Sequence, residues 1–302
     1  MKVLLLSEIT SIHTKRWADS LSKAGIQVCV FSLFKNESER PSSLYEVVSV
    51  SLPQRSRQER IDDGSFSKLR YLTAVSKLKQ VIKSYKPDII HAHYASSYGL
   101  LGALAFKHPY VVSVWGSDIL LFPKVSFIHR SVIKFVFRKA DYLFSTSRNM
   151  ANEGSRYTDK PFKVIPFGID CHVFRPERKQ HKVFTIGCTK NLLPIYGIDK
   201  LIRAFAIVCK TIQAKLVLVG DGPEREHLMA LAQSLNVQDI VSLEGNHNHD
   251  EMMRYYNEFD VAVFLSESES FGVVALEAMA CECPLIVSHT VGFDEVVPND
   301  TT

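Results

Sequence analysis

The stretch DVAVFLSESESFGVVALEAMACECPLIVS, residues 260–288, contains one complete strand–helix–strand unit. The apolar run at 260–266 predicts a buried strand, residues 271–281 predict a helix, and the run after Pro284 predicts a second strand. Strands joined by a crossover helix run parallel, and parallel sheets are covered by helices on both faces. The stretch therefore places this part of the chain in an α/β domain.

The same alternation of strands and helices extends over all 302 residues, a length that suffices for about two domains. One series occupies residues 1–174 and a second begins at 183, and the polar stretch RPERKQHK at 175–182 predicts a linker. We therefore expect an α/β protein with two Rossmann-like, parallel-sheet domains, 1–174 and 183–302, that face each other across a cleft. Ligands of such domains bind at the carboxyl ends of the strands.

The charge is divided unevenly between the two series. Residues 1–180 carry 28 Lys and Arg against 15 Asp and Glu, a net charge of +13, whereas residues 181–302 carry 8 against 17, a net charge of −9. The basic half suits an anionic partner such as a phospholipid or a phosphorylated acceptor, and it would also attract nucleic acid. Alternatively, the opposite charges help the two domains to attract each other.

The sequence does not predict a membrane span. No apolar run approaches the roughly 20 residues of a spanning helix, and MKVLLL at 1–6 is too short for a secretory signal. Residues 127–140 predict a basic amphipathic helix, which suits either a membrane surface or a core-packed position with a solvated basic face. We expect a cytoplasmic protein that touches at most the inner face of the membrane through its basic first domain. The predicted apolar face of the helix comprises Phe127, Ile128, Val132, Phe135 and Val136.

Two carboxylates frame the helix of the opening stretch. Glu269 lies in the loop just before Gly272, and Glu277 lies about two helical turns farther along. The first N–H groups of the helix point into the space beside Glu269, where they can bind an oxygen or a phosphate. Carboxylates accept hydrogen bonds from vicinal diols, so the pair suits a hexose and a ribose. In the simpler alternative, Glu269 caps the helix and Glu277 is solvated.

The stretch ESFGVVALEAMACECP at 269–284 resembles the acidic signature of the retaining glycosyltransferases of the GT4 family, which have the GT-B fold. Three further segments resemble family motifs in the family's order: HAHYASSYGLLGALAFKHPYVVSVWGSD at 91–118, KVIPFGIDCHVFRP at 163–176 and LVLVGDGPER at 216–225. The resemblance covers nearly the whole chain. It implies transfer of a sugar from a nucleotide sugar, with retention at the anomeric carbon and without a metal ion or other cofactor.

The resemblance also implies roles for residues of the second domain. By position, Glu269 contacts the hydroxyls of the donor sugar in catalysis, the amides of residues 271–273 cradle sugar or phosphate, and Glu277 accepts from the ribose. A UDP-sugar is the expected donor, a glycan or lipid-linked glycan of bacterial polysaccharide synthesis is the expected acceptor, and no nucleic acid is expected to bind. The expected donor-binding residues are Lys190, Tyr196, Gly220, Gly222, Glu269, Ser270, Phe271, Gly272, Val273 and Glu277.

Two positions near the expected diphosphate depart from the family. Lys190 stands at the position of a family cation, whereas Tyr196 replaces a family Lys, so a phenol that carries no charge takes the place of one cation. In the first domain, ITSIHTKRW at 9–17 lacks the family's paired glycines. Ser11, His13 and Thr14 lie where the first helix begins, and they are expected either to bind phosphate or, for Ser11 or Thr14, to cap the helix.

The acceptor side is expected at residues 91–118. Trp115 replaces a family His and suits stacking on a sugar, and Asp118 is the expected catalytic group there, as a base or a hydroxyl orienter. The alternative for Asp118 is a cap on the following segment. His91 and His93 face the same side of their strand, and His93 is expected to line the acceptor side, although a structural role suits either histidine.

Family members continue beyond the position at which this chain ends, Thr302. The sequence therefore predicts an incomplete second domain, as in the product of a truncated gene, in a fragment or in a protein completed by a partner. Two other functions stay open, namely a non-catalytic protein that binds sugar nucleotides or serves as a scaffold, and a GT-B sugar-nucleotide epimerase. A Rossmann dehydrogenase is disfavoured because neither first strand is followed by G-x-G-x-x-G.

Overall fold

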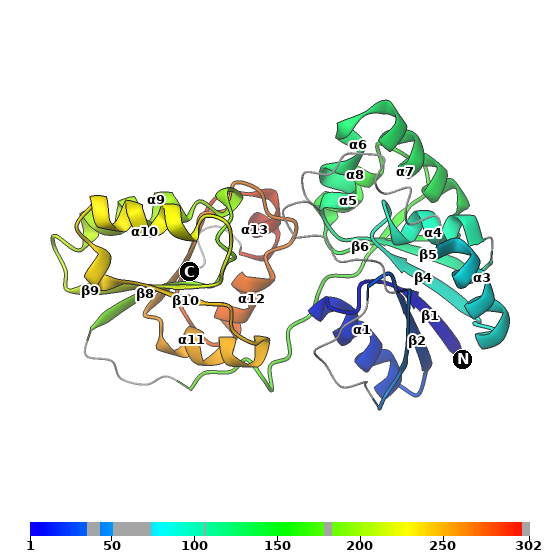
Figure 1. The fold of residues 1–302 in the computed structure, drawn as a ribbon, viewed down its shortest axis with the longest axis horizontal. Coiled ribbons are helices and arrows are strands. Elements are labelled where there is room, and N and C mark those ends of the chain that lie inside the picture. The colour runs from blue at the N-terminus through cyan, green and yellow to red at the C-terminus, as the bar shows by residue number, and fades with distance from the viewer. Residues whose placement is uncertain (35–42, 51–73, 106, 178–182, 298–302) are drawn as a thin grey trace. The chain divides into compact units, whose positions relative to one another are not determined.

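The structure, a computed structural model, describes residues 1–34, 43–50, 74–105, 107–177 and 183–297. The chain forms two compact units, Met1–Pro166 and Phe167–Thr302 (Figure 1). The division falls after Pro166, whereas the sequence placed it after residue 174, and residues 178–182 of the expected linker lie outside the described residues. Phe174 accounts for the difference because it is 1% exposed and belongs to the core of the second unit.

The first unit contains a seven-stranded, fully parallel sheet in the order β3-β2-β1-β4-β5-β6-β7. The strands β1, β2, β4 and β5 are almost entirely buried, and Leu4, Leu5 and Leu6 of β1 are completely buried, as a sheet covered on both sides requires. The strands are β1 (Lys2–Leu6), β2 (Gln27–Ser32), β3 (Glu46–Ser49), β4 (Ile89–His93), β5 (Tyr110–Val114), β6 (Tyr142–Ser145) and β7 (Phe162–Val164).

The helices of the first unit connect these strands in sequence. The sequence also predicts a helix at 66–85. The structure describes this helix from Ala74 onward, and its first part lies outside the described residues. The helices are α1 (Ile12–Lys23), α3 (Ala74–Tyr85), α4 (Tyr98–Ala105), α5 (Ser117–Leu120), α6 (Phe122–Val125), α7 (Phe127–Lys139) and α8 (Arg148–Gly154).

Helix α7 packs only part of its predicted apolar face against the core. Its buried side chains are Ile133, Val136 and Phe137, which follow the i, i+3, i+4 spacing of one helical face. Phe127 and Ile128, which also belong to the predicted apolar face, are 77% and 41% exposed. They belong to the first turn of α7, directly after the N-cap residue Ser126.

The second unit contains a five-stranded parallel sheet in the order β10-β9-β8-β11-β12. In Figure 1, α9 and α10 lie on one face of this sheet and α11 lies on the other. The strands are β8 (Phe184–Cys188), β9 (Ala214–Val219), β10 (Val241–Gly245), β11 (Val261–Phe264) and β12 (Leu285–Val287). The α-helices are α9 (Ile198–Val208), α10 (Arg225–Ser234), α11 (Met252–Glu258), α12 (Val273–Ala280) and α13 (Val291–Val296), and the 3-10 turns are η2 (Pro194–Tyr196), η3 (Gln238–Ile240) and η4 (His249–Glu251).

The strand order reverses once in each sheet. The reversal lies between β1 and β4 in the first unit and between β8 and β11 in the second. Open parallel sheets bind ligands in the crevice outside the carboxyl ends of the strands at such a reversal. The predicted class, two Rossmann-like units with parallel sheets, is confirmed. The loops after β1, β8 and β11 carry candidate site residues, as do the loops after the neighbouring strands β5 and β9.

Candidate functional site

A largely buried ion pair lies at the strand reversal in the second unit. Lys190 follows β8, Glu269 follows β11, and Lys190 Nζ lies 2.5 Å from Glu269 Oε2. The side chains are only 9% and 13% exposed, so each charge depends on the other for compensation. The rings of Tyr196 and Phe293 lie 4.7 and 5.7 Å from the same ammonium group. Tyr196 therefore supports the charge of Lys190 through its ring face and does not add a second charge.

Glycines hold the backbone close around this ion pair. Gly220 and Gly222 follow β9, and a Cβ at either position would collide with the carbonyl oxygen of Lys190 or of Leu192. Gly292 lies in the first turn of α13, where a Cβ would collide with the carbonyl oxygen of Glu269. Only glycine permits such close approach. These contacts fix the two loops that present Lys190 and Glu269.

The start of α12 lies directly beside Glu269. Gly272 precedes the helix with φ +84°, a left-handed conformation that favours glycine, and Val273 is the first helical residue. Phe271 is 5% exposed, and the backbone N–H of Ser270 donates to Glu269 Oε1 at 3.3 Å. Residues 269–273 thus form one backbone surface at the positive end of the α12 dipole, which suits a phosphate or a sugar oxygen.

Glu277 is buried and not solvated, with a residual exposure of 5%. Its Oε1 lies 2.8 Å from His249 Nε2, and its Oε2 accepts from the Tyr256 hydroxyl at 3.1 Å. The Tyr256 hydroxyl lies 2.7 Å from Thr189 Oγ1. Burial, together with the nearby charge of Glu277, raises the pKa of Tyr256 well above its usual value, so the phenol keeps its proton. The sequence analysis missed these three partners, of which only Thr189 carried a signal, because it adjoins Lys190 after β8.

The reversal in the first unit carries a hydrogen-bonded cluster around Ser7. Ser7 directly follows β1, and its Oγ lies 2.6 Å from Thr14 Oγ1 and 2.9 Å from His93 Nδ1. Thr14 therefore joins the loop after β1, whereas Ser11 is the N-cap residue of α1 but makes no side-chain capping bond. The sequence analysis missed Ser7, although its place at the carboxyl end of the first strand was a usable signal.

Trp115 and three histidines complete this cluster. The Trp115 ring stacks on His93 with centroids 4.1 Å apart and meets His13 edge-on at 6.0 Å. His91 and His93 face the same side of β4, as predicted, with ring centroids 4.6 Å apart. Burial lowers the pKa of His91 to about 3, and burial plus the neighbouring histidines holds the pKa of His93 well below its usual value. Both rings are thus neutral at pH 7.

Both carboxylate oxygens of Asp118 accept hydrogen bonds from backbone N–H groups. Its Oδ2 accepts from the N–H of Ala95 at 2.8 Å, and its Oδ1 accepts from the N–H groups of Trp115 and Gly116 at 3.1 and 2.9 Å. The residue is 1% exposed, and burial raises the pKa of its carboxyl group. This geometry holds the loop after β5 to the loop after β4, and it favours a positioning role over that of a base that meets the acceptor.

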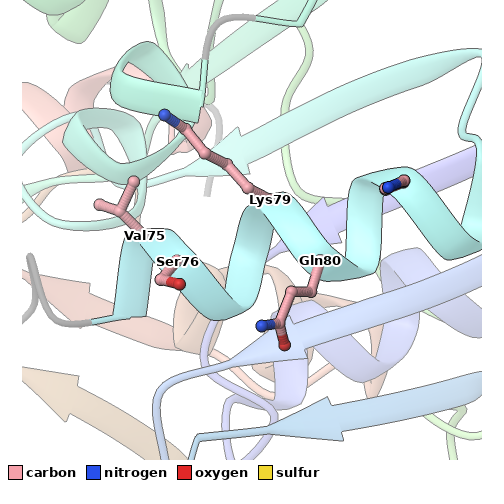
Figure 2. A pocket seen from close by; sticks show the side chains of 5 residues that line it. Val75, Ser76, Lys79 and Gln80 are labelled. Atoms are coloured by element: carbon pink, nitrogen blue, oxygen red, sulfur yellow. The ribbon is translucent and has the colours of Figure 1, made fainter.

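Two surface recesses lie away from these clusters. One runs along α3 and is lined by Val75, Ser76, Lys79, Gln80 and Lys83 (Figure 2). The other is lined by Glu177, Met253, Arg254, Asn257 and Glu258. Neither contains a predicted site residue.

Within the described ranges, no group of three or more His, Cys, Asp and Glu side chains is arranged to hold a metal ion. In the same residues, no helix combines the length and apolarity needed to cross a membrane.

Each unit matches a known family. Residues 2–147 match the family described as glycosyl transferase 4-like, and residues 172–302 match glycosyl transferases group 1. The chain is 28% identical over 247 residues to N-acetyl-alpha-D-glucosaminyl L-malate synthase of Bacillus anthracis, covering 76% of this chain and 64% of that protein. It is 32% identical over 237 residues to alpha-monoglucosyldiacylglycerol synthase of Streptococcus pneumoniae, covering 70% of this chain and 54% of that protein. The chain thus spans less than two thirds of the length of these relatives.

Solved structures share the fold at low sequence identity. Sucrose-phosphate synthase from Thermosynechococcus elongatus has a TM-score of 0.81 and 20% identity, over 97% of this chain and 82% of that one. The Anabaena protein HepE in complex with UDP and glucose has a TM-score of 0.73 and 19% identity, over 98% of this chain and 83% of that one. At these identities the likeness concerns the fold alone.

Proposed function

The chain belongs to the GT4 family of glycosyltransferases with the GT-B fold, and we propose that it transfers a sugar from a nucleotide sugar to an acceptor hydroxyl. The observation that carries this proposal is the buried pair of Lys190 and Glu269 at the strand reversal. A cation and a carboxylate side by side meet the two demands of such a donor. Lys190 attracts the diphosphate, and Glu269 accepts hydrogen bonds from the sugar hydroxyls.

The proposed reaction is a transfer with retention at the anomeric carbon. The bond from this carbon to the diphosphate oxygen breaks, the acceptor oxygen bonds to the same face, and the acceptor proton passes to the leaving phosphate. Negative charge develops on the diphosphate, where Lys190 and the first N–H groups of α12 stabilise it without a metal ion. Glu269 orients the sugar, and Asp118 positions the loop that carries Trp115 in the first unit.

A UDP-sugar is the proposed donor, and a glycan or lipid-linked glycan is the proposed acceptor. HepE, which shares the fold, was solved in complex with UDP and glucose. Among the relatives, the name alpha-monoglucosyldiacylglycerol synthase describes a lipid product. These observations support a UDP-sugar as the donor and a glycan or lipid-linked glycan as the acceptor.

Nucleotide binding tests the proposal. A ligand that binds only the folded state stabilises it by about 2.7 kcal/mol at 100 times its Kd. Because the proposed donor is a UDP-sugar, we expect UDP to raise the melting temperature more than GDP, ADP or CMP. Lys190→Met is expected to abolish the shift relative to its own unliganded protein. Lys200→Met is the matched control, because Lys200 is exposed and pairs with the exposed Glu267. A cooperatively melting protein that responds to no nucleotide would contradict a nucleotide-sugar transferase and favour a scaffold.

We also propose that the first unit touches an anionic membrane surface. The segment from α5 to α7, residues 117–139, contains five Lys and Arg and a single carboxylate, Asp118, which is buried. Exposed apolar side chains surrounded by cations favour a bilayer with anionic lipids. The apolar part of this α6–α7 patch consists of Leu121, Val125, Phe127 and Ile128, with exposures of 51%, 54%, 77% and 41%.

Phe127→Ser is expected to weaken binding to phosphatidylglycerol-containing vesicles about tenfold or more, because a buried Phe side chain contributes about 1.5–3 kcal/mol. Co-sedimentation with anionic and with phosphatidylcholine vesicles measures the effect, and added salt should weaken the anionic binding. Ile207→Ser is the matched control, since Ile207 is 68% exposed on α9 of the second unit. Equal losses in the two variants, or equal binding to both lipids, would overturn the assignment of the patch.

A further inference from the structure

Glu277 receives a donor on each of its two oxygens, from the η4 turn and from α11. We propose that His249 and Tyr256 are positioning residues that hold this carboxylate as the acceptor for the two ribose hydroxyls of the nucleotide. The inference rests on the proposed function, because it concerns the nucleotide of the same donor. It adds the means by which the protein would distinguish a ribose from a deoxyribose.

The directions of the hydrogen bonds around Glu277 follow from its chemistry. An ionised carboxylate only accepts, so the Tyr256 hydroxyl donates to Oε2, and the Thr189 hydroxyl must then donate to the Tyr256 oxygen. By the same reasoning, His249 Nε2 carries the proton that it donates to Oε1. Among the described residues, no Lys or Arg forms an ion pair with Glu277. The carboxylate is therefore oriented by the hydrogen-bond donors of His249 and Tyr256 and is not paired with a Lys or Arg side chain.

The number of remaining acceptor positions matches a vicinal diol. A carboxylate offers about four lone-pair sites, and the two protein donors occupy one on each oxygen. About one site per oxygen is left, which is the requirement of two adjacent hydroxyls. The Glu277 side chain is 7% exposed and the His249 side chain is 23% exposed, so the network reaches the surface at the histidine.

The rings of the two donors are themselves fixed. The Phe174 ring meets the His249 ring edge-on, with centroids 5.0 Å apart, and packs against the Tyr256 ring, with centroids 6.1 Å apart. A capping box of Asn248 and Glu251 holds the turn that carries His249, and Tyr256 is only 1% exposed. Groups held in this way present Glu277 in one orientation before a ligand arrives, which lowers the entropic cost of binding.

A comparison of UDP with 2′,3′-dideoxy-UDP isolates this role. We expect the wild-type protein to prefer UDP by about tenfold or more, since hydrogen bonds to a charged group are the strong ones. In Tyr256→Phe and in His249→Ala, we expect the preference to fall to about two- to threefold, while the Kd for the dideoxy nucleotide stays within about twofold. His249→Gln keeps a donor and is expected to retain part of the preference. Isothermal titration calorimetry provides both Kd values for each variant.

Neighbouring residues of the same kinds provide matched controls. His247 and Tyr255 lie beside the positioning residues and bond to each other at 2.9 Å. His247→Ala and Tyr255→Phe are expected to keep the wild-type preference for UDP. If the Kd values for both nucleotides rise in parallel in Tyr256→Phe and His249→Ala, or if neither changes, the network is structural and the inference is overturned.

The outcome for the wild-type protein separates this inference from the proposed function. If it binds UDP and the dideoxy nucleotide equally well, nucleotide binding stands but the role of Glu277 and its two positioning residues fails. If it binds neither nucleotide, the proposed function fails and the inference fails with it.

Discussion

Glu269→Gln is expected to lower the rate of sugar transfer by about 10²- to 10³-fold, the range found when one preorganised electrostatic group is removed from an active site. The substitution keeps the size of the side chain but removes the charge that pairs with Lys190 at 2.5 Å. It therefore weakens the hydrogen bonds to the sugar hydroxyls and also releases the cation from its fixed position. The measurement is the release of nucleoside diphosphate from a sugar nucleotide in the presence of an acceptor. The nucleotide that raises the melting temperature most determines which sugar nucleotide is used.

Glu267→Gln is the matched control for this substitution. Glu267 lies in the same loop, but it is 59% exposed and pairs with the exposed Lys200, so its loss is expected to leave transfer unchanged. Breaking the buried pair at Glu269 is expected to destabilise the fold by up to about 3 kcal/mol, so both variants must be compared below their melting temperatures. Full activity in Glu269→Gln would contradict the assignment of Glu269 to the donor site.

Gly292→Ala is expected to lower the rate of sugar transfer by about 10²-fold, because it displaces the loop that carries Glu269 without changing Glu269 itself. The added methyl group would collide with the backbone of Glu269 and press against the N–H of Phe271, so the loop must shift. A displacement of about 1 Å is enough for such a loss when reacting groups depend on orientation. Overpacking is also expected to cost about 1–3 kcal/mol of stability. Kinetics and thermal melting of the same preparation measure the two effects.

Gly168→Ala controls for the loss of a glycine as such. Gly168 also belongs to the second unit, but a Cβ there meets nothing within 4 Å, so both activity and stability are expected to stay at wild-type values. If Gly292→Ala behaves in the same way, then the close packing of α13 on the Glu269 loop does not position that loop.

The order of the main elements could be predicted because the signals are local. Apolar runs predicted β8, β9 and β11, and the helical run 271–281 predicted α12. Short elements without a strong period were not predicted, namely β3, α5, α6, α8 and α13. For helix α7 the sequence left open whether the apolar face meets a membrane surface or the core. The structure buries Val136 of that face and leaves Phe127 and Ile128 exposed in the first turn.

The candidate site was predicted in its loops but not in its contacts. The ion pair of Lys190 with Glu269 joins residues 79 positions apart, and the bond of Ser7 to His93 joins residues 86 positions apart. Strand order brings these loops together, and sequence spacing does not reveal which side chains then meet. For the same reason Asp118, expected on the acceptor side, lies against three backbone N–H groups.

The sequence by itself therefore determined the α/β class, the parallel sheets, the loop that carries Glu269 and the helix that carries Glu277, because periodicity and motif spacing are properties of neighbouring residues. Only the tertiary structure decided what each carboxylate meets. Glu277 is 28 positions from His249 and 21 from Tyr256, and these side chains converge because α11 packs against α12. Burial then makes each of these polar contacts obligatory, since a carboxylate removed from water is stable only when its oxygens have donors.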